Sequence, residues 1–276
     1  MGNLMNTAPE ILEANINAGT AKANLPFGKM SLMGIMAGAF IALGGATSST
    51  AAHAIADVGV SRAVAGAVFP LGLMLVVFMG TELFTGNCLM ITGFMDKKYN
   101  LQKMVRNLVV VYFTNLIGAL IVAALVVYSG NLNYSGGLLG AYTIKVAVGK
   151  AAISPVQGIT SGILCNVLVC FAVLMATAAK DIAGKIWAIF FPIWAFVIGG
   201  FEHCVANMYY IPAGMMAAAN PDYVAKAQEA YGLTAAQIEG LTIAGSLANF
   251  IPVTIGNILG GMVFVGLPLY LIHKKK

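Results

Sequence analysis

Six long apolar segments alternate with short polar connections along this chain. A helix needs about 20 apolar residues to cross the hydrocarbon core of a membrane, and every segment reaches that length. The pattern therefore predicts six membrane-spanning helices, over residues 30–56, 63–95, 104–129, 156–179, 186–219 and 243–272. The second and fifth segments exceed one crossing and carry glycine, proline and glutamate in their interior, so we expect these two helices to be broken.

Composition agrees with this pattern. Apolar residues make up 59% of the chain and charged residues 9%, and the mean hydropathy is +0.87. Soluble domains carry about 25% charged residues, and a soluble fold of this composition would expose large apolar patches. We expect an all-α membrane protein in which residues 1–276 form a single transmembrane domain.

Both ends of the chain are expected to lie outside the membrane. Residues 1–28 lack the long apolar stretch of a signal peptide. They predict an amphipathic helix with Ile11, Leu12 and Ile16 against the membrane surface. Residues 273–276 form a basic tail.

The basic residues predict the orientation. Of the 15 Lys and Arg residues, eleven fall on the side of the termini, and the other four are Arg62, Lys145, Lys150 and Lys226. The positive-inside rule then places both termini in the cytoplasm and the protein in the cytoplasmic membrane. Because the basic residues lie in short connections, the net charge of +5 indicates topology, and we expect the lipid bilayer rather than nucleic acid as a partner.

The four cysteines lie inside apolar segments, which argues against a disulfide framework. Cys165, Cys170 and Cys204 together with His203 could form a metal site. Buried free cysteine usually behaves as a small apolar residue. We therefore expect neither a metal nor a cofactor.

An internal repeat is the most informative feature of the chain. The pattern G-x-E-x-x-x-x-N occurs at residues 80–87 and again at 200–207, 120 residues later. Further pairs match in order: Gly34 and Gly38 with Gly158 and Gly162, and Asn115 and Gly118 with Asn257 and Gly260. Three crossings per repeat is an odd number, so residues 156–272 should enter the membrane upside down relative to residues 30–129.

The helix breaks are predicted at Gly80–Glu82 and Gly200–Glu202. A carboxylate at mid-membrane costs about 2.5–3.5 kcal/mol even on the lenient insertion scale. We expect the two glutamates to accept hydrogen bonds from backbone N–H groups that the breaks set free, and to face away from any pathway; a cation or proton pathway is the alternative. Broken backbone at this depth indicates a central, water-accessible path.

Four motifs in order resemble the formate/nitrite transporter family over nearly the whole chain. They are Glu82-Leu83-Phe84-Thr85-Gly86-Asn87, residues 162–170 around Cys165-Asn166, residues 200–208 around His203, and residues 252–261 around Asn257. Val167 stands where many fourth-helix signatures have tryptophan. The Glu-Leu-Phe-Thr-Gly form differs from the Asp-Leu-Phe-Thr-Ser form of formate channels and weakly favours the hydrosulfide-type branch.

The resemblance implies an aquaporin-like fold of six helices per chain, one pore in each chain, and a homopentamer. It also implies a central His203 between two hydrophobic constrictions, and Lys150 facing the outer vestibule. The constriction positions that it implies are Phe69, Leu73, Leu83, Phe84, Val169 and Phe196, and the polar lining positions are Thr85, Asn166 and Asn207.

The expected function is passage of small monovalent anions: formate, nitrite or hydrosulfide. An anion in an apolar neck loses its water at great cost. Half-helix N-termini, attraction by Lys150 and a proton or hydrogen bond from His203 would reduce that cost. Structural roles for His203, Lys150, Phe84 and Phe196 stay open, as do passive and proton-coupled transport.

Three other functions are weaker alternatives. A water or neutral-solute channel would share the half-helices, but the chain contains no Asn-Pro-Ala. An ammonium channel would need an aromatic cation site. A membrane-embedded enzyme would need grouped catalytic residues or metal ligands, and only one histidine lies centrally, so we expect no enzyme.

Overall fold

The computed structural model describes residues 5–274, which are helical apart from turns and one isolated bridge between Met5 and Ala179. Among these residues, six stretches are long and apolar enough to span a membrane, as the sequence predicts. They are Phe27–Ala52 (α2), Val58–Phe78 (α3, Val58–Val68, and α4, Pro70–Phe78), Leu101–Tyr128 (α7), Pro155–Ala178 (α9), Ile182–Gly199 (α10) and Ile243–His273. The last stretch contains α14 (Ile243–Leu259), a π-helical turn (Gly260–Gly266) and α15 (Leu267–His273).

The second and fifth spans end early and resume as half-helices, which confirms the predicted breaks. After α4, the chain forms α5 (Phe84–Asn87), a 3₁₀ turn (Cys88–Met90) and α6 (Ile91–Met95). After α10, it forms the longer half-helix α11 (Cys204–Ala217). Gly80 and Gly200 have φ angles of 61° and 67°, a region that glycine enters without the steric cost of a Cβ.

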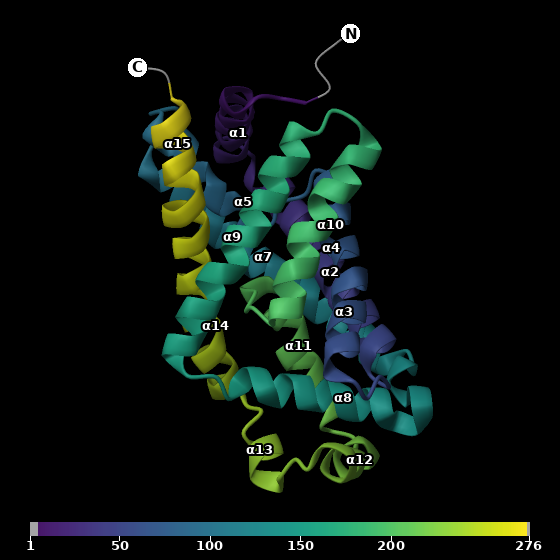
Figure 1. The fold of residues 1–276 in the computed structure, drawn as a ribbon. Coiled ribbons are helices and arrows are strands. Elements are labelled where there is room, and N and C mark those ends of the chain that lie inside the picture. The colour runs from purple at the N-terminus through teal and green to yellow at the C-terminus, as the bar shows by residue number, and fades with distance from the viewer. Residues whose placement is uncertain (1–4, 275–276) are drawn as a thin grey trace.

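The two halves of the chain run in opposite directions through the molecule. The first span, α2, follows the terminal helix α1 (Ala8–Ala23) at one end, and α9 follows α8 (Tyr134–Ala151) at the other end (Figure 1). Helices α1 and α15 lie at the same end. This arrangement is the one that three crossings per repeat require.

Glycines allow the paired spans of each half to pack closely. A Cβ on Gly38 would overlap the backbone of Asn115 in α7, and a Cβ on Gly118 would overlap the backbone of Ile35 in α2. In the second half, a Cβ on Gly162 would lie 2.8 Å from the Val253 carbonyl oxygen. The matched glycines therefore serve close helix contact.

Two segments differ from the expectations. Leu12 and Ile16 of α1 are buried at 2% and 4% exposure, against the bundle rather than the membrane surface. Residues 134–151 form α8, which the apolar pattern did not predict. Helix α8 packs with α12 (Pro221–Tyr231) in a second small core that includes Leu139, Ile144 and Tyr223.

Candidate functional site

Two asparagines hold the broken backbone in place. The Phe84 N–H donates to Asn115 Oδ1 at 2.9 Å, and the Cys204 N–H donates to Asn257 Oδ1 at 2.9 Å. Each asparagine also donates its Nδ2 to the carbonyl of the glutamate in its own break, at 2.9 Å from Asn115 to Glu82 and at 3.0 Å from Asn257 to Glu202. The freed amides of the half-helices thus bind asparagine side chains, and the expectation that the glutamates accept from them is wrong.

The glutamates are paired with lysines instead. Glu82, at 2% exposure, lies 2.6 Å from Lys22 Nζ, and Glu202 lies 3.0 Å from Lys150 Nζ. Each second carboxylate oxygen accepts from the asparagine that ends its motif, Asn87 at 2.7 Å and Asn207 at 2.6 Å. A buried charge needs such compensation. The two carboxylates are therefore neutralised within the protein, as expected for groups that do not face a pathway.

Each glutamate, its lysine and the asparagines around them form a glutamate cluster, and a third asparagine belongs to each cluster. Asn107 Nδ2 donates to Glu82 Oε2 at 3.2 Å and to the Lys22 carbonyl at 3.3 Å. Asn249 Nδ2 donates to the Lys150 carbonyl at 2.8 Å and lies 3.5 Å from Glu202 Oε2. Lys22, Asn107 and Asn249 were not predicted from sequence to belong to this site. One signal could have found the asparagines, because each stands eight residues before the asparagine that accepts from its half-helix.

His203 lies where the two half-helices meet. It is 2% exposed, and its Nδ1 accepts from the Ala206 N–H at 3.0 Å, which caps α11. Because Nδ1 is an acceptor, the ring proton of a neutral imidazole lies on Nε2. That nitrogen lies 3.1 Å from Thr85 Oγ1 of α5, so Nε2–H donates across the junction.

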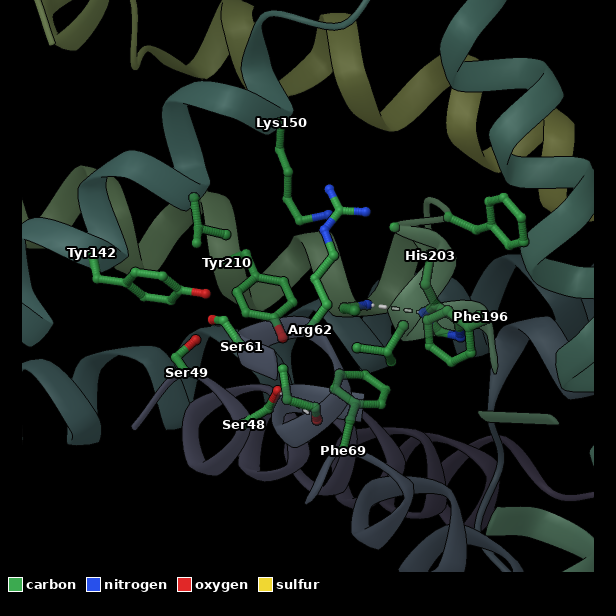
Figure 2. A pocket seen from close by; sticks show the side chains of 16 residues that line it. Ser48, Ser49, Ser61, Arg62, Phe69, Tyr142, Lys150, Phe196, His203 and Tyr210 are labelled. Carbon is green, nitrogen blue, oxygen red and sulfur yellow. Dashed lines mark hydrogen bonds between the residues drawn. The ribbon is translucent and has the colours of Figure 1, made fainter. Parts of the chain in front are cut away.

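An open cavity of about 230 Å³ reaches His203 from the end of the molecule that carries α8. Figure 2 shows the Arg62 and Lys150 side chains pointing into the cavity that His203 and two phenylalanines also border. The Phe69 and Phe196 rings meet edge to face at 5.4 Å, and Phe196 stacks on His203 at 6.0 Å. This ring pair forms an apolar wall of the cavity beside the histidine.

The other predicted positions divide into two groups. Leu73, Leu83 and Val169 are buried at 2%, 2% and 1% exposure. Phe84 packs on Tyr112 at 5.0 Å and borders an apolar groove on the outer side of α7 and α14, so the structure does not bring it to the cavity.

The predicted polar lining residues have structural partners. Asn166 donates to the carbonyls of Thr85 at 3.2 Å and Asn257 at 2.6 Å, and Asn207 is held by Glu202 and Asn249. Both asparagines stabilise the breaks.

Several cavity residues escaped the sequence analysis. Arg62 served only as a topology marker, and five hydroxyl-bearing residues of the cavity were not predicted. They are Ser48, Ser49, Ser61, Tyr142 and Tyr210. In residues 5–274, no three His, Cys, Asp or Glu side chains come together in a way that could hold a metal.

Comparison with known proteins identifies the chain's relatives. Residues 9–271 match the family described as "Formate/nitrite transporter". A "Probable formate transporter" of Methanothermobacter thermautotrophicus is 38% identical over 96% of this chain and 96% of the relative. "Formate channel FocA" of Haemophilus influenzae is 37% identical over 91% of this chain and 88% of the relative.

Solved structures agree. A "Pentameric formate channel with formate bound" is 33% identical, with a TM-score of 0.78 over 90% of this chain and 98% of that chain. An "FNT family ion channel" is 28% identical, with the same TM-score of 0.78 over 96% of this chain and 97% of the other. These relatives do not support the preference for the hydrosulfide-type branch, and they leave no place for the enzyme alternative. The chain belongs to the formate/nitrite transporter family.

Proposed function

We propose that this protein conducts small monovalent anions, formate in particular, through a pore in each protomer with His203 at its midpoint. The observation that carries the proposal is the His203–Thr85 hydrogen bond, 3.1 Å long, at the junction of the two half-helices. The named formate transporters among its relatives support the choice of formate.

The geometry favours a hydrogen bond over proton transfer at the midpoint. His203 Nδ1 already accepts from the Ala206 N–H, so the neutral ring carries one proton, on Nε2. A complete transfer of that proton would leave an imidazolate in an apolar site. Nε2–H can instead turn from Thr85 to a carboxylate oxygen, and a hydrogen bond to a charged group is one of the stronger kinds.

Two further features reduce the cost of desolvating the anion at the midpoint. His203 is the N-cap of the 14-residue helix α11, so an anion at its ring lies at the positive end of that helix. The carboxylates of Glu82 and Glu202 are already matched by Lys22 and Lys150 and repel an anion less than bare charges would.

The assembly and orientation are part of the proposal. The solved relative described as pentameric supports a homopentamer, with the pore within each protomer. The excess of basic residues at the end that carries α1 and α15 supports cytoplasmic termini under the positive-inside rule. The cavity that reaches His203 then opens to the outside.

Flux into proteoliposomes tests the proposal. We expect wild-type protein to conduct formate and nitrite. His203→Asn should keep the oligomer and some conduction, because an amide can also cap α11 and donate, but the pH dependence and anion selectivity should change. Identical pH profiles and selectivity in wild type and His203→Asn would remove the histidine from the mechanism.

A further inference from the structure

Arg62 holds an unusual place in the outer cavity. It lies one turn into α3, it is exposed, and its Nη1 donates to the Ile198 carbonyl at 3.2 Å. A Cβ built on Gly200 would lie 3.1 Å from the same Nη1. The guanidinium therefore rests on the backbone of the second break, where it borders the cavity that leads to His203 (Figure 2).

Within the described part of the chain, the charge of Arg62 has no carboxylate partner. The four ion pairs within residues 5–274 involve Lys22, Lys98, Lys150 and Lys274. Lys150 also borders this cavity, but Glu202 matches its charge at 3.0 Å. Of the two cationic residues in residues 5–274 that line this cavity, Arg62 is thus the one without a carboxylate partner.

The chemistry around Arg62 suits a planar anion. A guanidinium presents parallel N–H groups that match two oxygens of one carboxylate or nitrite. Tyr142, Tyr210 and Ser49 bring hydroxyl groups to the same cavity, and hydroxyls can donate to oxygen acceptors. The Phe69–Phe196 ring pair and His203 border the same cavity, and Phe196 stacks on the histidine ring.

We propose that Arg62, with the hydroxyls of Tyr142 and Tyr210, forms a loading site that binds a planar monovalent oxyanion in the outer cavity before it reaches His203. This site deepens the proposed function and rests on it for its role in transport. Lys150, which the sequence analysis chose as the attracting cation, acts in this view as the partner that neutralises Glu202.

The fifth span has no arginine at the position that matches Arg62. Asp57 caps α3 by accepting from the Val60 N–H, and Asp181 caps α10 by accepting from the Gly184 N–H. Five residues after these matched caps stand Arg62 and Ile186. The repeat therefore places Arg62 at the mouth that carries α8 and Ile186 at the matching position of the fifth span, so removing Arg62 should change anion entry most at the mouth that carries α8.

Arginine-specific labelling tests binding without relying on transport. The chain has two arginines, Arg62 and Arg106, and Arg106 lies towards the α1 end, where it donates to the Leu25 carbonyl at 3.1 Å. We expect sodium formate to slow modification of Arg62 by phenylglyoxal in the intact oligomer, as read by mass spectrometry. Arg106 is the internal control, and sodium chloride at the same ionic strength is the salt control. Equal protection by chloride and formate, or equal effects on both arginines, would overturn the site.

Flux measured from each face gives a second test. In vesicles of known orientation, Arg62→Gln should raise the half-saturating formate concentration about fivefold from the α8 face, the upper end of what an exposed charge pair contributes. The maximal rate should stay near that of wild type, and so should the half-saturating formate concentration measured from the opposite face. Arg62→Lys should fall between the two, and Arg106→Gln is the matched control.

The two tests separate the possible failures. If wild-type protein protects Arg62 with formate but conducts none, the proposed function fails and the site stands. If formate passes but neither protection nor a face-specific change is seen, the loading site fails alone. Should Arg62→Gln not assemble, wild-type protection and the Arg62→Lys variant still decide the matter.

Discussion

The two helix breaks have almost the same scaffold and quite different chemistry. Each break has a positive-φ glycine, a buried glutamate paired with lysine, and an asparagine that accepts from the first amide of the half-helix. The residues after the glutamates differ: Leu83 begins the first half-helix and His203 begins the second. The repeat thus conserves what holds the broken backbone and varies what faces the centre.

This difference places an imidazole from the second half, and none from the first, at the midpoint. His203 caps α11 through Nδ1, whereas Leu83 offers no side-chain cap to α5. The first repeat supplies Thr85 as the partner of Nε2, at the position where the second repeat has Val205. Each half contributes one member of the central hydrogen bond. Neither repeat alone could build it.

Breaking the glutamate clusters should have the largest effect and should be equal in the two halves. Glu82→Ala and Glu202→Ala each leave a half-buried lysine without its partner and remove an acceptor from two asparagines. Loss of one member of a buried pair costs about 3 kcal/mol or more. We expect a similar loss of thermal stability in detergent for both variants. A large loss in one variant with little change in the other would show that the two scaffolds are not equivalent.

Making the second break resemble the first should reduce conduction. His203→Leu removes the central donor, and a lost hydrogen bond to a charged group corresponds to about a tenfold or greater fall in formate flux. It also removes the cap of α11, which costs about 1 kcal/mol of stability. His203→Asn is the control, because it keeps an acceptor and a donor. Equal flux in the leucine and asparagine variants would mean that hydrogen bonding at the midpoint does not control conduction.

The comparison also explains what the sequence could and could not predict. Spans, breaks and the opposed repeat follow from apolar length and the spacing of Gly80 and Gly200 with their glutamates, which are local signals. The lysine partners were out of reach because Lys22 and Glu82 are 60 residues apart, and α8, which carries Lys150, has no long apolar run. Phe84 was assigned to a constriction through the family resemblance, and that role stays a prediction; its contact with Tyr112 depends on how α7 packs, which the sequence pattern does not specify. Arg62 could be identified as a site residue only from the folded cavity, because a single arginine in the sequence indicates only membrane topology.

The smallest effect concerns how the short first half-helix is anchored. Helix α11 has 14 residues, whereas α5 and α6 have 4 and 5, so the first half depends more on contacts made at its end. Asp96, directly after α6, pairs with Lys274 and accepts from the Tyr270 hydroxyl at 3.3 Å. The hydrogen bond from Lys274 holds the pKa of the Asp96 carboxyl below its ordinary value.

A lowered carboxyl pKa means that the folded state favours the charged form, so this contribution is present above the ordinary pKa of aspartate and is lost only as pH falls through the lowered value. We therefore expect the end of α15 to stay anchored across neutral and mildly acidic pH and to loosen only in strong acid. Asp96→Asn should make residues 267–274 exchange amide hydrogens faster at pH 7, with the exchange of α11 unchanged and formate flux close to wild type. Matched exchange in wild type and variant would show that Tyr270 and the packing of α15 suffice as the anchor. Loosening of wild-type α15 near pH 6 would contradict the lowered pKa, because Asp96 would still be charged there.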